Sequence, residues 1–276
     1  MRDLATGDLV KLGTLYMGST KIPRPTKPWK NSSKPYSNAE VGNIQSYSAG
    51  ATLEIRDTEA NDADKMQWIE VIDGGKKYLI CDRVMLVDIM WDELNAQNLI
   101  FGKNITIDGQ QYKLRVLTGG AERREGGPEP SYGGGKLPNE WDNWIVNEAN
   151  LPGLPIPSST DLDSTLNSTD LNSPHNQKWN WMGVYSWCQE TYLHDTEDCV
   201  TRGYDSARYF THNYASRRYG SRGWRPVLEA LWSPPKMQMK IDGQLKSYVD
   251  GHVKVDGELK RIDRMWTKIN GRLVEV

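Results

Sequence analysis

The chain has 276 residues, a formal net charge of -2 and a pI of about 6.1, so it lacks the global basic charge of a protein that coats DNA. Its hydrophobic content of 37% and mean hydropathy of -0.68 are low for an enzyme of this size. They favour a β-rich, loop-rich surface protein. No apolar run is long enough to span a membrane, and no signal peptide is visible.

The aromatic residues are unevenly distributed among types, with 11 Trp and 13 Tyr against 2 Phe. Trp and Tyr join an apolar body to a polar group, which suits half-exposed positions and interfaces. The three cysteines, Cys81, Cys188 and Cys199, are an odd number, so at least one is unpaired and a disulfide scaffold is not expected. This usage indicates synthesis in a reducing cytosol.

The first part of the chain predicts strands separated by one exposed insertion. Residues 7–19 indicate a strand, a turn and a short continuation. Residues 19–37 carry four prolines and four lysines, which exclude a central strand or a helix and indicate an exposed loop. Residues 67–89 predict a hairpin that turns at Asp73-Gly74-Gly75.

The next segment combines a helix and a hairpin. Residues 91–103 predict a short helix capped by Gly102. Residues 104–120 give the clearest hairpin signal of this half, because apolar residues alternate on both sides of Asp108-Gly109.

The middle of the chain is rich in loops. Residues 119–135 contain seven glycines and too little apolar content to fold alone. Residues 138–148 predict a helix with Asn139 as its N-cap. Residues 149–176 are nearly all Ser, Thr, Asp, Asn and Pro with scattered leucines, and indicate a long exposed loop.

The C-terminal 41 residues, 236–276, contain a repeat. "KIDGQLK", "KVDGELK" and "KINGRLV" recur with a period of 14 residues. Asp-Gly and Asn-Gly favour two-residue hairpin turns, so the repeat predicts a β-meander of about six short strands. Such a ribbon buries only one face and needs a partner surface or sister copies, so the segment is expected to mediate attachment or oligomerisation. The residues assigned to assembly are Lys240, Asp242, Gly243, Lys254, Asp256, Gly257, Lys268, Asn270 and Gly271.

Signatures of catalysis and of metal binding are missing from the sequence. The four histidines lie too far apart for a zinc pair, and there is no C-x-x-C, Walker A, G-x-G-x-x-G or G-x-S-x-G motif. The acidic residues Asp195, Glu197 and Asp198 are interpreted as a solvated loop, with a calcium loop as the alternative. We therefore predict no catalytic residue, no metal and no cofactor.

One stretch, residues 202–231, interleaves arginines with tyrosines and allows two interpretations. Its aromatic rings can stack on bases or sugars while its arginines meet acidic groups. Alternatively, Tyr204, Ala207 and Phe210 point into a core and the arginines are solvated or paired with local carboxylates. Nucleic acid is disfavoured by the acidic chain, and the nearby tryptophans allow the same two interpretations. The candidate ligand-binding residues are Trp179, Trp181, Tyr209, Tyr214, Arg217 and Tyr219.

The order of several motifs resembles a family of phage and prophage proteins. "IFGKNITIDGQQYKLRVLTGG", "NEWDNWI", "WNWMGVYSWCQET", "RGYDSAR" and "GWRPVLEAL" follow one another, and the resemblance covers roughly residues 7–232. They resemble the C-type-lectin-like fold of formylglycine-generating (sulfatase-modifying) enzymes and of variable phage receptor-binding domains. The motif that carries the resemblance is the closing run Arg202-Gly203, Ser206-Ala207-Arg208 and Gly223-Trp224-Arg225-Pro226.

The chain departs from that family where the family's chemistry resides. Residues 205–222 contain no cysteine, whereas formylglycine-generating enzymes place copper-binding cysteines in that interval. The His-x₃-His-x-Glu motif of iron-dependent relatives is missing. Glu129-Pro130-Ser131 and Trp141-Asp142-Asn143 only partly match the motifs of a calcium-dependent lectin. The resemblance therefore implies the scaffold without the chemistry.

These observations predict an α+β, β-rich protein with a lectin-like domain over 1–235 and a repeat tail over 236–276, which resembles the "KVDG" repeat ends of phage structural proteins. We expect a non-enzymatic virion protein, made in the bacterial cytoplasm, that is surface-exposed and adhesive toward host glycans. Its expected partners are other virion proteins and copies of itself, with no membrane. A degenerate or unrecognised enzyme of the sulfatase-modifying type and a purely structural decoration, neck or tail protein remain as alternatives.

Overall fold

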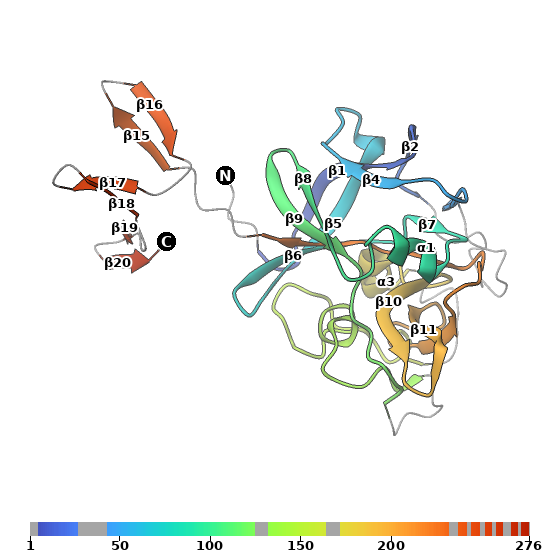
Figure 1. The fold of residues 1–276 in the computed structure, drawn as a ribbon. Helices are drawn as coiled ribbons and strands as arrows, with labels where there is room; N and C mark the ends of the chain where they lie inside the picture. Colours follow the sequence, from blue (N-terminus) through green and yellow to red (C-terminus); the bar gives the residue numbers. More distant parts are fainter. Residues whose placement is uncertain are drawn as a thin grey trace. The chain divides into compact units, whose positions relative to one another are not determined.

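The computed structural model describes residues 5–26, 43–124, 132–163 and 172–231, together with six strands between residues 237 and 275 (Figure 1). The chain divides into two compact units, Met1–Ala230 and Leu231–Val276. Strands make up 40% of the structure and helices 11%, which confirms the β-rich class predicted from the sequence.

The larger sheet of the first unit has eight antiparallel strands. Its order is β2 (Thr20–Ile22), β1 (Leu9–Met17), β5 (Lys65–Asp73), β6 (Lys76–Cys81), β14 (Val227–Ala230), β9 (Gln110–Arg115) and β8 (Lys103–Ile107), with β4 (Leu53–Arg56) on the free side of β1. The sheet curls so that β4 and β8 approach each other. The N–H and hydroxyl of Thr58, which follows β4, donate to the Asp108 carboxylate beyond β8 at 3.0 and 2.6 Å.

The two predicted hairpin turns are confirmed, and both depend on positive φ angles. Gly74 and Gly75 have φ of 56° and 75° and join β5 to β6. Asp108 and Gly109 have φ of 49° and 78° and join β8 to β9. Both residues of a type I′ turn require this left-handed region, which few residue types other than Gly, Asn and Asp adopt.

A smaller, mixed sheet of six strands completes the first unit. Its order is β12 (Phe210–Tyr214), β11 (Asp195–Gly203), β10 (Tyr185–Tyr192), β13 (Arg222–Trp224), β7 (Leu86–Val87) and β3 (Gln45–Ser46). The described helical segments are short. They are η1 (Asp62–Asp64), α1 (Trp91–Ala96), η3 (Trp141–Ile145, a turn of π-helix) and α3 (Pro174–Trp179). Among the described residues, no helix has the length and apolar character needed to cross a membrane.

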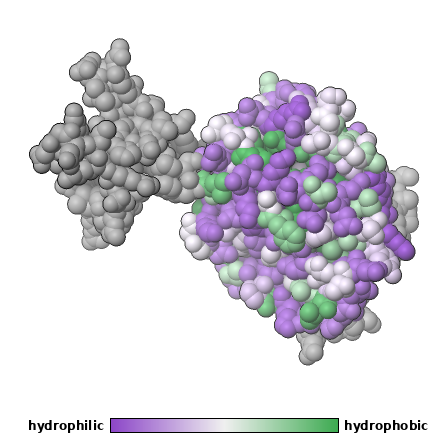
Figure 2. All heavy atoms as spheres, viewed as in Figure 1, coloured by the Kyte–Doolittle hydropathy of each residue, from purple (hydrophilic) through white to green (hydrophobic). Residues whose placement is uncertain are grey.

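Two buried clusters occupy opposite faces of β5, β6 and β14. Trp68, Leu79 and Leu228 belong to the first cluster, whereas their neighbours along the strands, Ile80 and Val227, belong to the second. Strands that are buried on both faces read as nearly continuous apolar runs, which explains the sequence of residues 67–89. The exterior is mostly hydrophilic on the face that Figure 2 shows, where apolar side chains form small separate patches.

Two helices expected from the sequence need correction in this unit. The helix expected over 91–103 ends at Ala96, because Asn98 adopts a left-handed conformation with φ of 60°; Gly102 does not cap it. The helix expected over 138–148 is the single turn η3, whose N-cap is Glu140; Asn139, the expected N-cap, lies one residue earlier and accepts from the N–H of Asp142 at 2.9 Å.

In their described residues, the two segments expected to be exposed loops are exposed only in part; residues 27–37 and 164–171 of these segments lie outside the described residues. Residues 20–22 of the first segment form the edge strand β2, in which Ile22 is fully buried. In the second segment, Asp161 and His175 are each 1% exposed, and helix α3 begins at Pro174. Scattered apolar residues and well-bonded polar ones allow such a segment to pack although its composition is that of a loop.

A fully buried arginine, Arg202 at the end of β11, joins three segments of the first unit. Its guanidinium group forms a bidentate ion pair with Asp142, with distances of 2.5 and 3.1 Å. It also donates to the carbonyls of Gly119 and Tyr209 at 2.7 and 3.1 Å. Its central carbon lies 5.7 Å from the centroid of the Trp141 ring. The charge of Arg202 is thus compensated entirely within the core.

Arg225 is the second buried arginine, and it connects the two sheets. It donates to the Ser186 hydroxyl at 3.0 Å and to the carbonyls of Cys81 and Trp179 at 3.2 and 2.7 Å. Its guanidinium carbon lies 5.6 Å from the centroid of the same Trp141 ring. Burial lowers the pKa of Arg225 to about 10, so the residue stays protonated at neutral pH.

The second unit contains three hairpins that follow the repeat. They pair β15 (Met237–Ile241) with β16 (Gln244–Tyr248), β17 (His252–Val255) with β18 (Glu258–Arg261), and β19 (Trp266–Ile269) with β20 (Arg272–Glu275). Among the described residues each hairpin is a separate two-stranded sheet, so a continuous meander is not confirmed. Of the assembly residues, Lys240, Lys254 and Lys268 lie in strands. The turn residues Asp242, Gly243, Asp256, Gly257, Asn270 and Gly271 lie outside the described residues.

We predict that Arg202→Met lowers the free energy of unfolding by about 3–5 kcal/mol, because it removes the bidentate partner of the buried Asp142 carboxylate and leaves only Arg124, at 3.3 Å, as a counter-charge. The measurement is urea unfolding at neutral pH, with Arg217→Met, an exposed arginine, as a control that changes stability by about 1 kcal/mol or less. A loss below about 1 kcal/mol for Arg202→Met would show that the ion pair does not organise the core.

Candidate functional site

The candidate site forms where β11 ends and the chain turns at Tyr204. This residue has φ of 86°, which is a strained conformation for a bulky side chain. Two backbone hydrogen bonds hold it, one from its N–H to the carbonyl of Trp181 at 2.9 Å and one from the N–H of Gly183 to its carbonyl at 3.0 Å. The turn stacks the Tyr204 ring on Tyr185, with centroids 4.4 Å apart and planes 7° apart.

Arg222, the first residue of β13, lies among these rings. It is only 8% exposed, and its guanidinium carbon is 4.7 Å from the centroid of Tyr185 and 4.2 Å from that of Tyr219. In the described part of the chain no carboxylate pairs with it, and its buried Nε has no hydrogen-bond partner. Burial lowers the pKa of Arg222, whereas Tyr185 and Tyr219 act in the opposite direction. Its charge therefore depends on the electron-rich ring faces.

Two more tyrosines and a carboxyl group complete the arrangement. Tyr209 lies 6.2 Å from Tyr185 and packs edge-on against Tyr132 at 4.7 Å between centroids. Tyr132 hydrogen-bonds to Asp205, whose pKa is raised to about 6 by burial. We name Tyr132, Tyr185, Tyr204, Asp205, Tyr209, Tyr219 and Arg222 the tyrosine–arginine cluster.

The structure brings together only some of the predicted ligand-binding residues. Tyr209 and Tyr219 belong to the tyrosine–arginine cluster. Tyr214 and Arg217 lie at the end of β12 and in the following connection, where they form a separate exposed pair with the guanidinium carbon 4.3 Å from the ring. Sequence reasoning missed Arg222 because a buried arginine without a carboxylate leaves no mark in the local pattern.

The predicted ligand-facing role of Trp179 and Trp181 is wrong, because both side chains are fully buried. The indole N–H of Trp181 donates to Nδ1 of His175 at 3.0 Å, and Nε2 of His175 donates to the carbonyl of Ile145 at 2.7 Å. Burial lowers the pKa of His175, which agrees with a neutral ring in this tautomer. These two hydrogen bonds, through His175, connect helix α3 to η3.

The alternative interpretation of residues 202–231 is confirmed for its apolar positions. Tyr204 and Phe210 are buried, and so is Ala207, whose carbonyl accepts from the indole N–H of Trp141 at 2.7 Å. The expectation that the arginines are solvated or paired with local carboxylates is wrong for the buried Arg202, which pairs with the distant Asp142, and for the buried Arg222 and Arg225. Residues 202–231 therefore contribute side chains both to the core and to the tyrosine–arginine cluster.

The acidic residues near position 197 are not all solvated. Asp195 and Glu197 are exposed, but Asp198 is 8% exposed and its Oδ2 lies 2.5 Å from Nδ1 of His212. The His212 ring stacks on Tyr192, with centroids 3.8 Å apart. In the described residues, no three His, Cys, Asp or Glu side chains gather closely enough to hold a metal ion.

The three cysteines are buried and free. Burial raises the pKa of Cys81 and of Cys199 to about 12, and that of Cys188 well above its usual value. Because the thiolate is the reactive form of cysteine, these side chains are poor nucleophiles and poor metal ligands at neutral pH.

No protein-family model, curated protein or solved structure matches this chain.

We predict that Asp205→Asn stabilises the protein at pH 7 by about 1–2 kcal/mol. This value is smaller than the free energy that corresponds to the whole pKa shift, because the carboxyl group is partly solvated. An unfolded aspartate titrates near pH 3.9, so the folded protein binds more protons than the unfolded chain between about pH 4 and 6. The protonated Asp205 carboxyl group therefore contributes stability at low pH, and this contribution is lost as the pH rises through this window.

Urea unfolding of the wild type and Asp205→Asn at pH 4 and pH 7 measures the effect. The gain should be present at pH 7 and nearly vanish at pH 4. An equal effect at both pH values would contradict the assigned burial of the carboxylate.

Proposed function

We propose that this chain is a non-enzymatic, surface-exposed structural protein of a bacteriophage particle, which binds host-surface glycans with its tyrosine–arginine cluster and attaches through its repeat tail. The lectin-like family suggested by the sequence motifs belongs to this proposal. The observation that carries it is the buried arginine, Arg222, which has ring faces around it and no carboxylate partner among the described residues.

The energetics of the cluster support a binding role. A strained Tyr204, an uncompensated Arg222 and a partly buried Asp205 each lower stability, and such features gather at functional sites. A core selected only for stability would gain from replacing them.

The chemistry of the cluster suits a carbohydrate. Tyrosine faces pack against the apolar C–H faces of sugar rings. The Asp205 carboxyl group can accept from sugar hydroxyls, and the Arg222 guanidinium group supplies donors. This combination requires no metal ion.

The second unit supports the attachment role. A single two-stranded hairpin is marginally stable in water, and the described hairpins pair only internally. Their 14-residue repeat presents three similar hairpins, which suits a surface of other virion proteins or of sister subunits.

We predict that Tyr209→Ala and Tyr219→Ala each weaken glycan binding by about tenfold or more, because each removes a stacking surface near the centre of the site. Glycan arrays and host-cell adsorption assays provide the measurement. Tyr214→Ala is the matched control, since Tyr214 is a tyrosine of the same segment outside the cluster, and it should bind as the wild type does.

The alternatives give different outcomes with the same preparations. Turnover of thiol-containing peptides, with a metal found by elemental analysis, would favour the sulfatase-modifying enzyme and contradict the proposal. Tight particle association without glycan or cell binding would favour the purely structural protein.

We also predict that truncation after Trp232 abolishes particle attachment or oligomerisation and leaves the first unit folded. The expectation rests on the two units being separately compact. Sedimentation and circular dichroism of the truncated and full-length chains test it. A truncated chain that still assembles normally would refute the role of the tail.

A further inference from the structure

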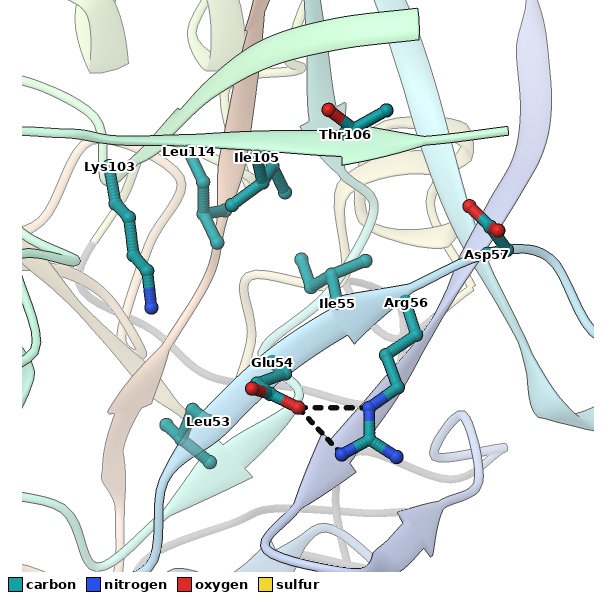
Figure 3. Close-up of a pocket in the computed structure, with 9 residues that line it drawn as sticks. All are labelled: Leu53, Glu54, Ile55, Arg56, Asp57, Lys103, Ile105, Thr106 and Leu114. Carbon is teal, nitrogen blue, oxygen red and sulfur yellow. Dashed lines mark hydrogen bonds and ion pairs between the residues drawn. The ribbon is translucent and has the colours of Figure 1, made fainter. Parts of the chain in front are cut away.

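A groove lies between β4 and β8, at the place where the curled sheet fails to close. It has a volume of about 470 Å³ (Figure 3). The buried side chains Leu53, Ile55 and Leu114 lie at its base, and the half-buried Ile105 flanks them. Figure 3 shows Ile55 pointing from β4 toward Leu114 and Ile105. The groove thus offers an apolar surface bounded by two strands.

The edge of β4 that faces the groove carries unpaired backbone groups. Thr52 faces β1, because its carbonyl accepts from the N–H of Gly18 at 2.8 Å. Backbone groups alternate along an antiparallel strand, so Leu53 and Ile55 direct theirs toward the groove. The N–H of Leu53 is satisfied by the Gln97 side chain at 2.7 Å. Among the described residues, no strand pairs with this edge at Ile55.

The edge of β8 has the same property. The Asp108-Gly109 turn makes Ile107 and Gln110 the hydrogen-bonded pair that flanks the hairpin. The alternation then directs the backbone groups of Asn104 and Thr106 away from β9 and toward the groove. In the described structure β9 is the only strand hydrogen-bonded to β8. Two open strand edges therefore face the same apolar surface.

The charges at the rim indicate what the groove prefers. Glu54 is engaged by the Arg56 guanidinium group at 2.6 Å, and Asp57 accepts from the N–H of Asp108 at 2.7 Å. Lys103 is the lining residue whose charged group has no bonded partner in the described structure. Its side chain points from β8 into the opening between the strands (Figure 3). An occupant with a carboxylate at this position would be favoured.

We propose that this groove binds an extended segment of a partner polypeptide by β-strand addition, with apolar residues at alternate positions and an acidic residue two positions beyond the last apolar one, on the same face of the segment. The unpaired backbone groups of β4 and β8 specify a strand, because only a peptide backbone offers donors and acceptors at matching intervals. Lys103 is paired with Leu114 and lies on the same face of β8 as Ile105. The apolar side chains of the segment therefore cover Leu53, Ile55 and Leu114, and an acidic residue on the same face of the segment, at its end, meets Lys103. β4 has four residues, so the segment is about four residues long.

The test uses the full chain and three synthetic peptides. The first is acetyl-Val-Thr-Val-Thr-Glu-amide, the second replaces Glu with Lys, and the third is the first with methylated backbone nitrogens along one edge. Backbone amide NMR signals of β4 and β8 report binding. We expect the first peptide to shift these signals, the second to bind more weakly, and the third to lose binding, because it cannot pair as a strand.

Lys103→Glu supplies the decisive variant. The charged group of Lys103 has no bonded partner in the described structure, so its replacement should not affect folding. It should reverse the preference between the first two peptides, with a change of about tenfold in their affinity ratio. Arg217→Glu makes the same change of net charge outside the groove and should leave the ratio unaltered.

Any of three results with the peptides would overturn the proposal. They are unchanged β4 and β8 signals at millimolar peptide, equal binding of the methylated peptide, and an affinity ratio that Lys103→Glu leaves unchanged. Concentration-dependent self-association that shifts the same signals and is lost in Lys103→Glu would also overturn it, by showing that a second copy fills the groove.

Discussion

The fold of the first unit depends on two buried arginines that lie beside one tryptophan ring. Arg202 and Arg225 approach Trp141 with their guanidinium groups, and each also bonds to segments distant in sequence. The ion pair of Arg202 with Asp142 fixes η3 against the end of β11, and Arg225 joins both sheets to α3. Charged groups are buried at a high desolvation cost, so every one of these bonds must form together. This requirement favours a single arrangement of the loops between the sheets.

That arrangement also positions the tyrosine–arginine cluster. Arg202 is held in the core and donates to the carbonyl of Tyr209. The strained turn at Tyr204 follows directly after Gly203. The cluster therefore begins where the rigid core ends. Arg222 lies three residues before Arg225 on the chain, so one short segment supplies a core arginine and a site arginine. A rigid support of this kind holds aromatic faces in place without reorganisation on binding.

The sequence predicted those features that local chemistry determines. The Gly74-Gly75 and Asp108-Gly109 turns were predictable because few residues tolerate positive φ, and the hairpins followed from them. The fate of the tryptophans was not predictable, since Trp181 meets His175 through packing between α3 and η3 rather than through any local pattern. Long-range geometry also decides the role of Arg222 and the opening between β4 and β8. The residue types suggested ligand recognition by aromatic rings. Only tertiary contacts, however, show which rings belong to the core and which to the tyrosine–arginine cluster.

The central claim is that the tyrosine–arginine cluster is the ligand-binding surface of the chain. Tyrosine ring NMR signals, recorded while a host-surface polysaccharide is added, test this claim most directly because each ring reports its own contacts. Our account predicts progressive shifts for Tyr209 and Tyr219, with the Tyr214 ring unaffected. Shifts confined to Tyr214, or no shift of any tyrosine ring at saturating polysaccharide, would contradict it.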